Sequence, residues 1–368
     1  MIERTLPMAL AVAMGASLLV GCGSESGSAK GAKTLSFKLT DDGCDPHDAK
    51  VAAGPVNFEV ENDGADAVTE LEVLDGDKIL GEVENISDGL SKSFSLTLEK
   101  GDYTLYCPGG SDERGTLSVT GNAKASSSAE EKAAVAEYRK YVERNTDGLV
   151  AEVEPFVAAV ESGDVAKAKD LYAPARIPYE RIEPVAESFG DLDPKIDARV
   201  NDVPPDQFGG FHKIEQALWV KNSTAGMAPV ARQLLADVKD LQQKVETVDL
   251  QAAQIANGAN ELLGEVSASK ITGEEERYSH IDLVDFDANV QGSQAAFDSV
   301  KDILKSRDPE LTKEIEGRFA AVHAALRPYE RGDGFVSYTE LTKSDTRTLA
   351  RQIDALAEPL SQVAAQVV

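Results

Sequence analysis

The spacing of apolar residues along the chain changes once, from that of strands to that of helices. This change constrains the fold more than any other feature. Within residues 33–122, apolar and polar residues alternate at every second position in several short runs. Beyond the small, polar segment 121–129, apolar residues recur at helical spacing. A period of two is typical of strands with one buried face, and a period of 3.6 is typical of amphipathic helices. The sequence therefore predicts a multidomain chain: a small β-sandwich over 33–122, a linker over 123–129 and an all-α helical bundle over 130–368.

Individual elements follow from the same patterns. Turn residues such as Asn62-Asp63-Gly64 separate short alternating runs, which predict strands at 35–39, 56–60, 71–73, 93–98 and 101–107. Long runs at helical spacing predict helices at 228–265, 277–306, 309–326 and 344–366. Long helices joined by short loops indicate a bundle.

The N-terminus has the pattern of a targeting signal. Residues 6–20 form an apolar run, which is shorter than the ~20 residues that a membrane-spanning helix needs and has the length of a signal-peptide core. Leu19-Val20-Gly21-Cys22 resembles the lipobox of bacterial lipoproteins, in which the cysteine receives the lipid. The resemblance implies a signal peptide over 1–21, a lipid on Cys22, a tether over 22–32 and a location on the extracytoplasmic face of the cell membrane. An ordinary secretory signal with a chance cysteine is the alternative.

The first domain resembles cupredoxin-like domains in the order of the segments 53–62 and 101–107, the second of which ends in Cys107. A blue-copper site uses two histidines, a cysteine and a weak axial ligand, whereas residues 33–122 contain only His47 and no methionine. Copper in this domain stays possible, but a blue-copper electron-transfer centre is not expected. Cys44 and Cys107 form either a structural disulfide, which an extracytoplasmic location permits, or a metal site with a carboxylate such as Glu70.

Three segments of the helical region have the residues of a metal site. Segment 177–187 places Glu180, Glu183 and Glu187 at spacings that share one helix face. Segment 209–219 contains His212 and Glu215, which project one imidazole and one carboxylate from a single turn. Segment 273–286 is rich in acids. Taken singly, each segment has a plain structural explanation, as a surface ion pair or a solvated first helical turn.

The three segments occur in an order that resembles the imelysin-like, M75 family. With the preceding domain, the whole chain is similar to EfeO-type iron-uptake lipoproteins. The resemblance implies an iron ion, Fe²⁺ or Fe³⁺, and two partners: a membrane iron permease and a peroxidase component of the same uptake system. Carried over by position, the metal ligands are Glu180, Glu183, Asp197, His212 and Glu215, with Glu275 and His280 as weaker candidates.

Composition and missing motifs narrow the function. A net charge of −27 opposes nucleic acid as a partner, because phosphates would be repelled. The chain has no His-Glu-x-x-His and no Gly-x-Ser-x-Gly motif, which zinc peptidases and many serine hydrolases use. The sequence therefore predicts an ion-capture protein that is not an enzyme. A surface metallopeptidase of the M75 type and a structural surface lipoprotein are the alternatives.

Overall fold

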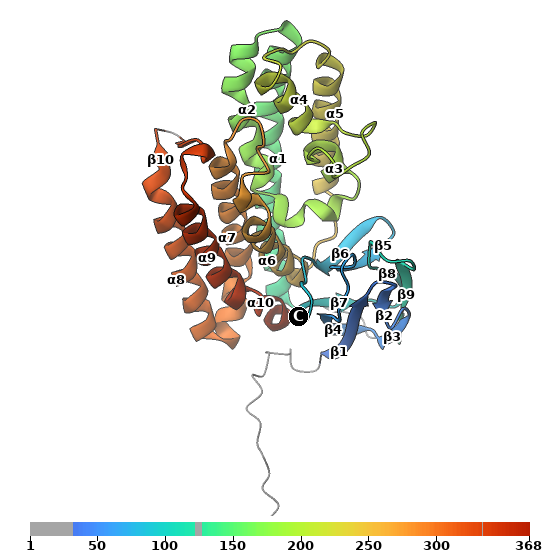
Figure 1. The fold of residues 1–368 in the computed structure, drawn as a ribbon. Helices are drawn as coiled ribbons and strands as arrows, with labels where there is room; N and C mark the ends of the chain where they lie inside the picture. Colours follow the sequence, from blue (N-terminus) through green and yellow to red (C-terminus); the bar gives the residue numbers. More distant parts are fainter. Residues whose placement is uncertain (1–31, 122–126, 333) are drawn as a thin grey trace, which may run out of the picture.

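The computed structural model describes residues 32–121, 127–332 and 334–368. It contains a β-sandwich followed by a bundle of helices (Figure 1), which confirms the predicted fold class. The predicted signal peptide, Cys22 and nearly all of the tether lie outside the described residues, as does most of the linker.

The sandwich has two sheets, with strand orders β2-β1-β4-β7 and β3-β9-β8-β5-β6. Parallel pairing of β1 with β4 and of β3 with β9 completes an otherwise antiparallel arrangement. Three phenylalanines stack through the core: the ring centroids of Phe37 and Phe58 lie 6.2 Å apart, and those of Phe58 and Phe94 lie 4.6 Å apart. The strands are β1 Lys33–Thr40, β2 Gly43–Asp45, β3 Ala49–Ala52, β4 Gly54–Asn62, β5 Leu71–Asp75, β6 Lys78–Val83, β7 Ser91–Leu98, β8 Gly101–Tyr106 and β9 Arg114–Thr120.

A disulfide joins Cys44 in β2 to Cys107, which follows β8, with a Cα–Cα distance of 5.9 Å. Of the two alternatives for this pair, the structure thus shows the disulfide, and neither sulfur is a free thiolate ligand. Glu70 lies elsewhere, in a cavity between the two domains.

The helices pack around one continuous apolar core. They are α1 Ala129–Ser162, α2 Val165–Glu180, α3 Leu192–Asp197, α4 Gly210–Trp219, α5 Ala228–Val245, α6 Ala252–Ala268, α7 Asp282–Arg307, α8 Pro309–Leu326, α9 Lys343–Leu360 and α10 Val363–Val367, with the short 3₁₀ helices η1 Glu183–Phe189, η2 Lys270–Thr272, η3 Arg327–Tyr329 and η4 Tyr338–Glu340. A two-residue hairpin, β10 Glu330–Arg331 with β11 Gly334–Phe335, completes the elements. None of the described helices is long and apolar enough to cross a membrane.

Two predicted helices are interrupted. The predicted helix 228–265 is two helices, α5 and α6, because Gln251 begins α6 anew with a capping box that it forms with Gln254. The predicted helix 344–366 ends at Leu360, one residue after Pro359, and resumes as α10. Helix α7 begins at Asp282 rather than 277. The residues before it form a turn. Two backbone N–H groups of this turn donate hydrogen bonds to a side chain of α4 instead of to a helical carbonyl.

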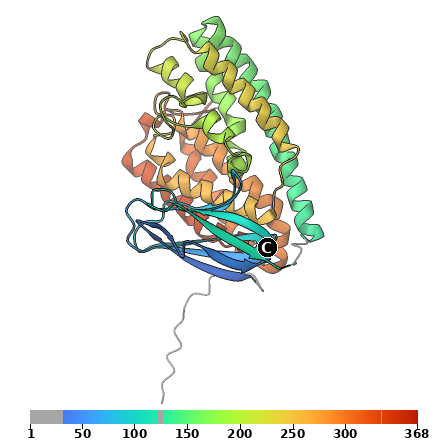
Figure 2. The ribbon, with the colours of Figure 1, turned by 90° about the vertical axis from the view of Figure 1, so that its right-hand side faces the viewer.

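The two domains meet along α6, with the sandwich lying beside the lower end of the bundle (Figures 1 and 2). Asn257 of α6 donates a 2.8 Å hydrogen bond to the backbone oxygen of Ser95 in β7. Lys78 of β6 donates a 2.6 Å bond to the backbone oxygen of Asp249. Gly258 lies so close to η1 that a Cβ would approach the Pro184 oxygen to 1.7 Å. The sandwich edge, α6 and η1 therefore form one packed junction.

Candidate metal centre

Helix α4 places His212 and Glu215 in the interior of the bundle. The helix begins at Gly210, whose φ is +61° and whose Cβ, if present, would lie 2.1 Å from the Ile196 oxygen. Only glycine accepts both conditions readily. This close approach puts the first turn of α4 against the end of α3, where Asp197 follows Ile196.

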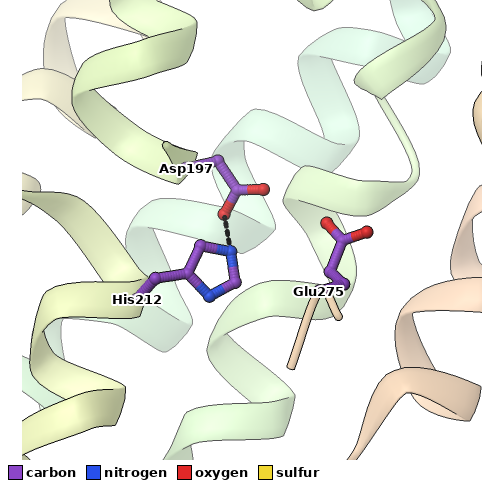
Figure 3. Close-up of side chains that lie close together, drawn as sticks. All are labelled: Asp197, His212 and Glu275. Atoms are coloured by element: carbon purple, nitrogen blue, oxygen red, sulfur yellow. Dashed lines mark ion pairs between the residues drawn. The ribbon is translucent and has the colours of Figure 1, made fainter. Parts of the chain in front are cut away.

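His212 is buried between carboxylates (Figure 3), with 2% of the residue exposed. Its Nδ1 lies 3.3 Å from Glu215 Oε2, and its Nε2 lies 3.6 Å from Asp197 Oδ1, which is too long for a hydrogen bond. Burial lowers the pKa of His212, but Asp197 and Glu215 outweigh burial and raise the pKa to about 9. The imidazole of the metal-free protein is therefore protonated at neutral pH.

Glu215 connects α4 to the turn before α7. Its Oε1 accepts hydrogen bonds from the backbone N–H groups of Tyr278 at 2.8 Å and Ser279 at 2.7 Å. Burial raises the pKa of Glu215, but His212 and these two amides lower it below its ordinary value. Glu215 is thus an ionised carboxylate, held at both oxygens.

A buried guanidinium occupies the centre of the site. Arg176 of α2 has no exposed surface and meets five carboxylates. Its Nε lies 2.7 Å from Glu276 and 3.0 Å from Asp285, and its Nη2 lies 3.6 Å from Glu275. It also pairs with Glu180 and Asp197. We call Arg176, His212 and the six carboxylates around them the buried cluster; the carboxylates are those of Glu180, Asp197, Glu215, Glu275, Glu276 and Asp285.

Lys270 is a second buried cation, at the rim of the cluster. Its Nζ pairs with Glu183, lies 3.2 Å from Glu275 and lies 3.8 Å from Glu180. Burial raises the pKa of Glu183 to about 8, although Lys270 opposes that shift. Glu183 therefore has a cationic partner already.

Several ligand atoms of the buried cluster have no hydrogen-bond partner. These buried atoms are His212 Nε2, Glu275 Oε2 and Asp285 Oδ1. Three sets in the cluster have ligand atoms that all lie within 4.8 Å of one another: Asp197–His212–Glu275, His212–Glu215–Glu276 and Glu180–Glu275–Asp285. Buried polar atoms are normally bonded, and oxygen with one imidazole is a ligand set for iron, manganese or calcium. The arrangement can hold a cation.

Comparison with known proteins identifies the family of this chain. The model of the imelysin family matches residues 134–363. The chain belongs to the imelysin family. The cupredoxin-like model matches residues 10–119, so this imelysin-family chain also has the predicted cupredoxin-like domain.

Curated relatives match most of the length of this chain. The chain is 40% identical over 334 residues to proteins named "Iron uptake system component EfeO" from Escherichia coli strain K12 and from Shigella flexneri, covering 88% of this chain and 89% of each relative. A solved structure, the novel purple cupredoxin from Nitrosopumilus maritimus, covers 23% of this chain and 99% of its own, with 14% identity and a TM-score of 0.19. That score is too low to carry an argument.

The predicted ligands of this imelysin-family chain do not all converge. Asp197, His212, Glu215 and Glu275 lie together in the buried cluster, and Glu180 joins it through Glu275 and Asp285. Two predicted ligands lie apart from these sets: Glu183 pairs with Lys270, and His280, at a φ of 59°, belongs to none of the ligand sets among the described residues.

The prediction that Glu180, Glu183 and Glu187 share one helix face is wrong. Helix α2 ends at Glu180, and Glu183 and Glu187 belong to η1. Pro184 explains the break, because its ring would clash with the carbonyl four residues earlier and it has no N–H to donate. Glu180 and Glu183 still meet at Lys270 and Asn289, whereas Glu187 lines the cavity between the two domains.

Four residues in or beside the buried cluster were not identified as site residues from the sequence: Arg176, Lys270, Glu276 and Asp285. Glu276 and Asp285 lie inside the acidic segment 273–286, so that segment was the right signal. Arg176 stands four residues before Glu180, a spacing that favours an ion pair on a helix. Nothing local distinguishes Lys270 from a surface lysine.

Proposed function

We propose that this chain captures an iron ion outside the cytoplasm for an uptake system, and that it is not an enzyme. The observation that carries the proposal is the buried imidazole of His212, whose Nε2 lacks a hydrogen-bond partner and faces Asp197 and Glu275. The relatives that cover most of this chain are named as iron-uptake components. Iron is the cargo of the site, and either Fe²⁺ or Fe³⁺ suits its ligands.

The charges of the cluster favour capture with release. An ion at His212 would take the place of the imidazole proton, because a metal ligand must be neutral imidazole. Arg176 stays as counterion for the carboxylates of the cluster that the ion does not bind. Protons and the ion therefore compete, and affinity should increase with pH. Release to a partner breaks only metal–ligand bonds and no covalent bond.

A metallopeptidase is the second candidate, and the residues around His212 do not favour it. A zinc peptidase of the usual kind needs two histidine ligands and a glutamate that activates water. The ligand sets that contain His212 supply only carboxylates besides that one imidazole. We therefore propose binding rather than catalysis.

The ligand assignment is tested with His212→Ala/Glu215→Ala in the soluble chain that begins after Cys22. Calorimetric titration with Fe²⁺ under anaerobic conditions should show affinity at the cluster reduced at least about a hundredfold, since each lost ligand costs about tenfold or more. Circular dichroism should show unchanged helix. His280→Asn is the matched control, because asparagine tolerates positive φ, and it should bind normally. Wild-type affinity and stoichiometry in a folded double variant would refute the site.

We further propose that the chain is lipid-anchored at Cys22 on the extracytoplasmic face of the cell membrane, after removal of 1–21. Its partners there would be a membrane iron permease and a peroxidase component. The lipobox-like segment 19–22 supports the anchor. Cys22→Ser should move the protein from the membrane fraction to the soluble fraction. A variant that stays with the membrane would contradict the anchor while leaving the metal site untouched.

A further inference from the structure

Lys270 is a buried lysine whose ammonium group lies among carboxylates. Only 4% of the residue is exposed. Its Nζ pairs with Glu183, lies 3.2 Å from Glu275 and lies 3.8 Å from Glu180. A lysine is almost never fully buried unless its charge is paired. The short helix η2, which begins at Lys270, thus directs a permanent positive charge into the bundle.

The carboxylates around this ammonium group are fixed in place. Asn289 donates hydrogen bonds to Glu180 at 2.9 Å and to Glu183 at 2.6 Å. Glu275 Oε1 faces the lysine, whereas its Oε2 is buried and has no hydrogen-bond partner. We call Glu180, Glu183 and Glu275 the lysine pocket. The ammonium group is a cation that the chain itself supplies to this pocket.

The lysine pocket adjoins the place proposed for the captured ion. Glu275 is a member of two ligand sets, one with Asp197 and His212 and the other with Glu180 and Asp285. Within each set the ligand atoms lie within 4.8 Å of one another. In two-metal centres the ions lie about 3.5–4 Å apart, close enough for one carboxylate to contact both. Glu275 is therefore placed to bridge an ion at His212 to a second ion in the lysine pocket.

One cavity reaches both places. It has a volume of about 410 Å³, lies between the two domains, is lined largely by carboxylates and reaches Asp197, Glu183 and Glu275. A cation in this cavity meets the lysine pocket and the ligands of the captured ion together. Among the described residues, Lys270 pairs with the three acids of its pocket and not with Asp197. Because repulsion between like charges falls with distance, Lys270 excludes an ion from the pocket more strongly than from the place beside His212.

We propose that Lys270 is a built-in cation that limits the metal site to a single ion. The inference rests on the proposed function, since it concerns the ion captured at His212. The ammonium group takes the oxygens of Glu183 and Glu275 that a second ion would use, so a two-metal carboxylate centre does not assemble. Lys270 is a specificity-determining residue and not a ligand: it sets how many ions bind.

The test compares the wild type with Lys270→Ala in the soluble chain that begins after Cys22, with Mn²⁺ as the probe. Calorimetry should show one further ion in Lys270→Ala, bound at least about a hundredfold more tightly than any further ion in the wild type, because a buried like charge is removed. Electron paramagnetic resonance should show two coupled Mn²⁺ ions, since Glu275 would bridge them. Circular dichroism checks that the variant is folded.

Two variants control for charge. Lys239→Ala removes a lysine whose pair with Glu154 is exposed, and it should leave the number of bound ions unchanged. Lys270→Arg restores a positive charge in the pocket and should restore the wild-type number of ions. A second ion in Lys270→Arg would show that the charge at this position is not what limits binding.

Wild-type crystals soaked with Mn²⁺ give a second measurement, which needs no variant. Anomalous scattering should show an ion beside His212 with Lys270 still paired to Glu183 and Glu275. An ion inside the lysine pocket, with the ammonium group displaced, would overturn the inference.

The outcomes separate this inference from the proposed capture. If folded Lys270→Ala gains no ion, or gains one that is not coupled to the first, the role of Lys270 is wrong while the capture site stands. The double variant His212→Ala/Glu215→Ala tests capture by itself, because it leaves Lys270 in place.

Discussion

Arg176 is a permanent positive charge within the site that is proposed to bind a metal ion reversibly. Its guanidinium is fully buried and faces five carboxylates. Two of them, Asp197 and Glu275, also belong to a ligand set with His212. The arginine opposes the effect of burial, which raises the pKa of Glu180, Glu276 and Asp285, and it pairs with all five carboxylates when no ion is bound.

Arg176→Met should destabilise the metal-free chain by about 3–5 kcal/mol, because it leaves buried carboxylates without their counterion. Urea unfolding in chelator measures this change. Arg232→Met is the matched control. Its pair with Glu161 is exposed, so the expected change is within about 1 kcal/mol. Equal changes in the two variants would show that Arg176 is not the internal counterion.

Close helix contacts position the polar groups of the cluster. Gly292 of α7 lies against the end of α2, where a Cβ would approach the Arg181 oxygen to 2.4 Å. One turn earlier on α7, Asn289 donates hydrogen bonds to Glu180 at 2.9 Å and Glu183 at 2.6 Å. The absence of a side chain at 292 therefore sets the distance at which Asn289 holds the two carboxylates.

Gly292→Ala should destabilise the protein by about 1–3 kcal/mol, since an added methyl group must push α7 from the end of α2. Gly317→Ala is the control. It lies within α8 with nothing near its missing Cβ, so alanine should stabilise the helix by about 0.5–1 kcal/mol. Thermal unfolding of both variants checks the difference in sign. Stabilisation of both would mean that the contact at 292 relaxes without cost.

Periodicity predicted the class of both domains and most of their long elements, because one buried face leaves a regular pattern in a strand or helix. It missed the strands β2, β3, β6 and β9. Glu82 in β6 shows one reason: a buried acid interrupts the alternation that identifies a strand. The end of α2 was predicted wrongly for another reason. The helical spacing of the glutamates continues past Pro184, although the helix itself ends at Glu180.

The candidate site was predictable only where its residues stand close in sequence. His212 and Glu215 share one turn of α4, and the acidic segment before α7 contains Glu275 and Glu276. Which carboxylates face His212 depends on how α2, α3 and α4 cross, and sequence spacing carries no such information. The contact of Gly210 with Ile196 is an example, because it joins segments through backbone atoms alone.

The acidic cavity links the stability of the whole molecule to pH. Burial raises the pKa of Glu72, Glu183 and Glu261 to about 8 and that of Glu84 and Glu265 to about 7. These carboxyls keep protons in the folded chain at pH values where the unfolded chain, with ordinary pKa values near 4.5, has lost them. The folded state therefore binds more protons over this range, and its stability falls as pH rises.

The metal-free chain should consequently unfold at a higher temperature at pH 5.5 than at pH 8.5. His212 acts in the same direction: its raised pKa stabilises the fold at low pH, and this contribution is lost as pH rises through about 9. Calorimetry in chelator measures the trend, and saturating metal should reduce it by replacing the lost protons. A midpoint that increases from pH 5.5 to 8.5 without metal would contradict this account.

Glu215 also determines how fast one loop exchanges with solvent. The amides of Tyr278 and Ser279 lie in a turn, where protons normally exchange with water within the time of local fluctuations. Both are instead bonded to a buried carboxylate of α4. Their protons can exchange only when the hydrogen bonds to Glu215 break. The same opening displaces the carboxylate that contacts His212. The deuterium uptake of two loop amides is thereby coupled to the integrity of the ligand set.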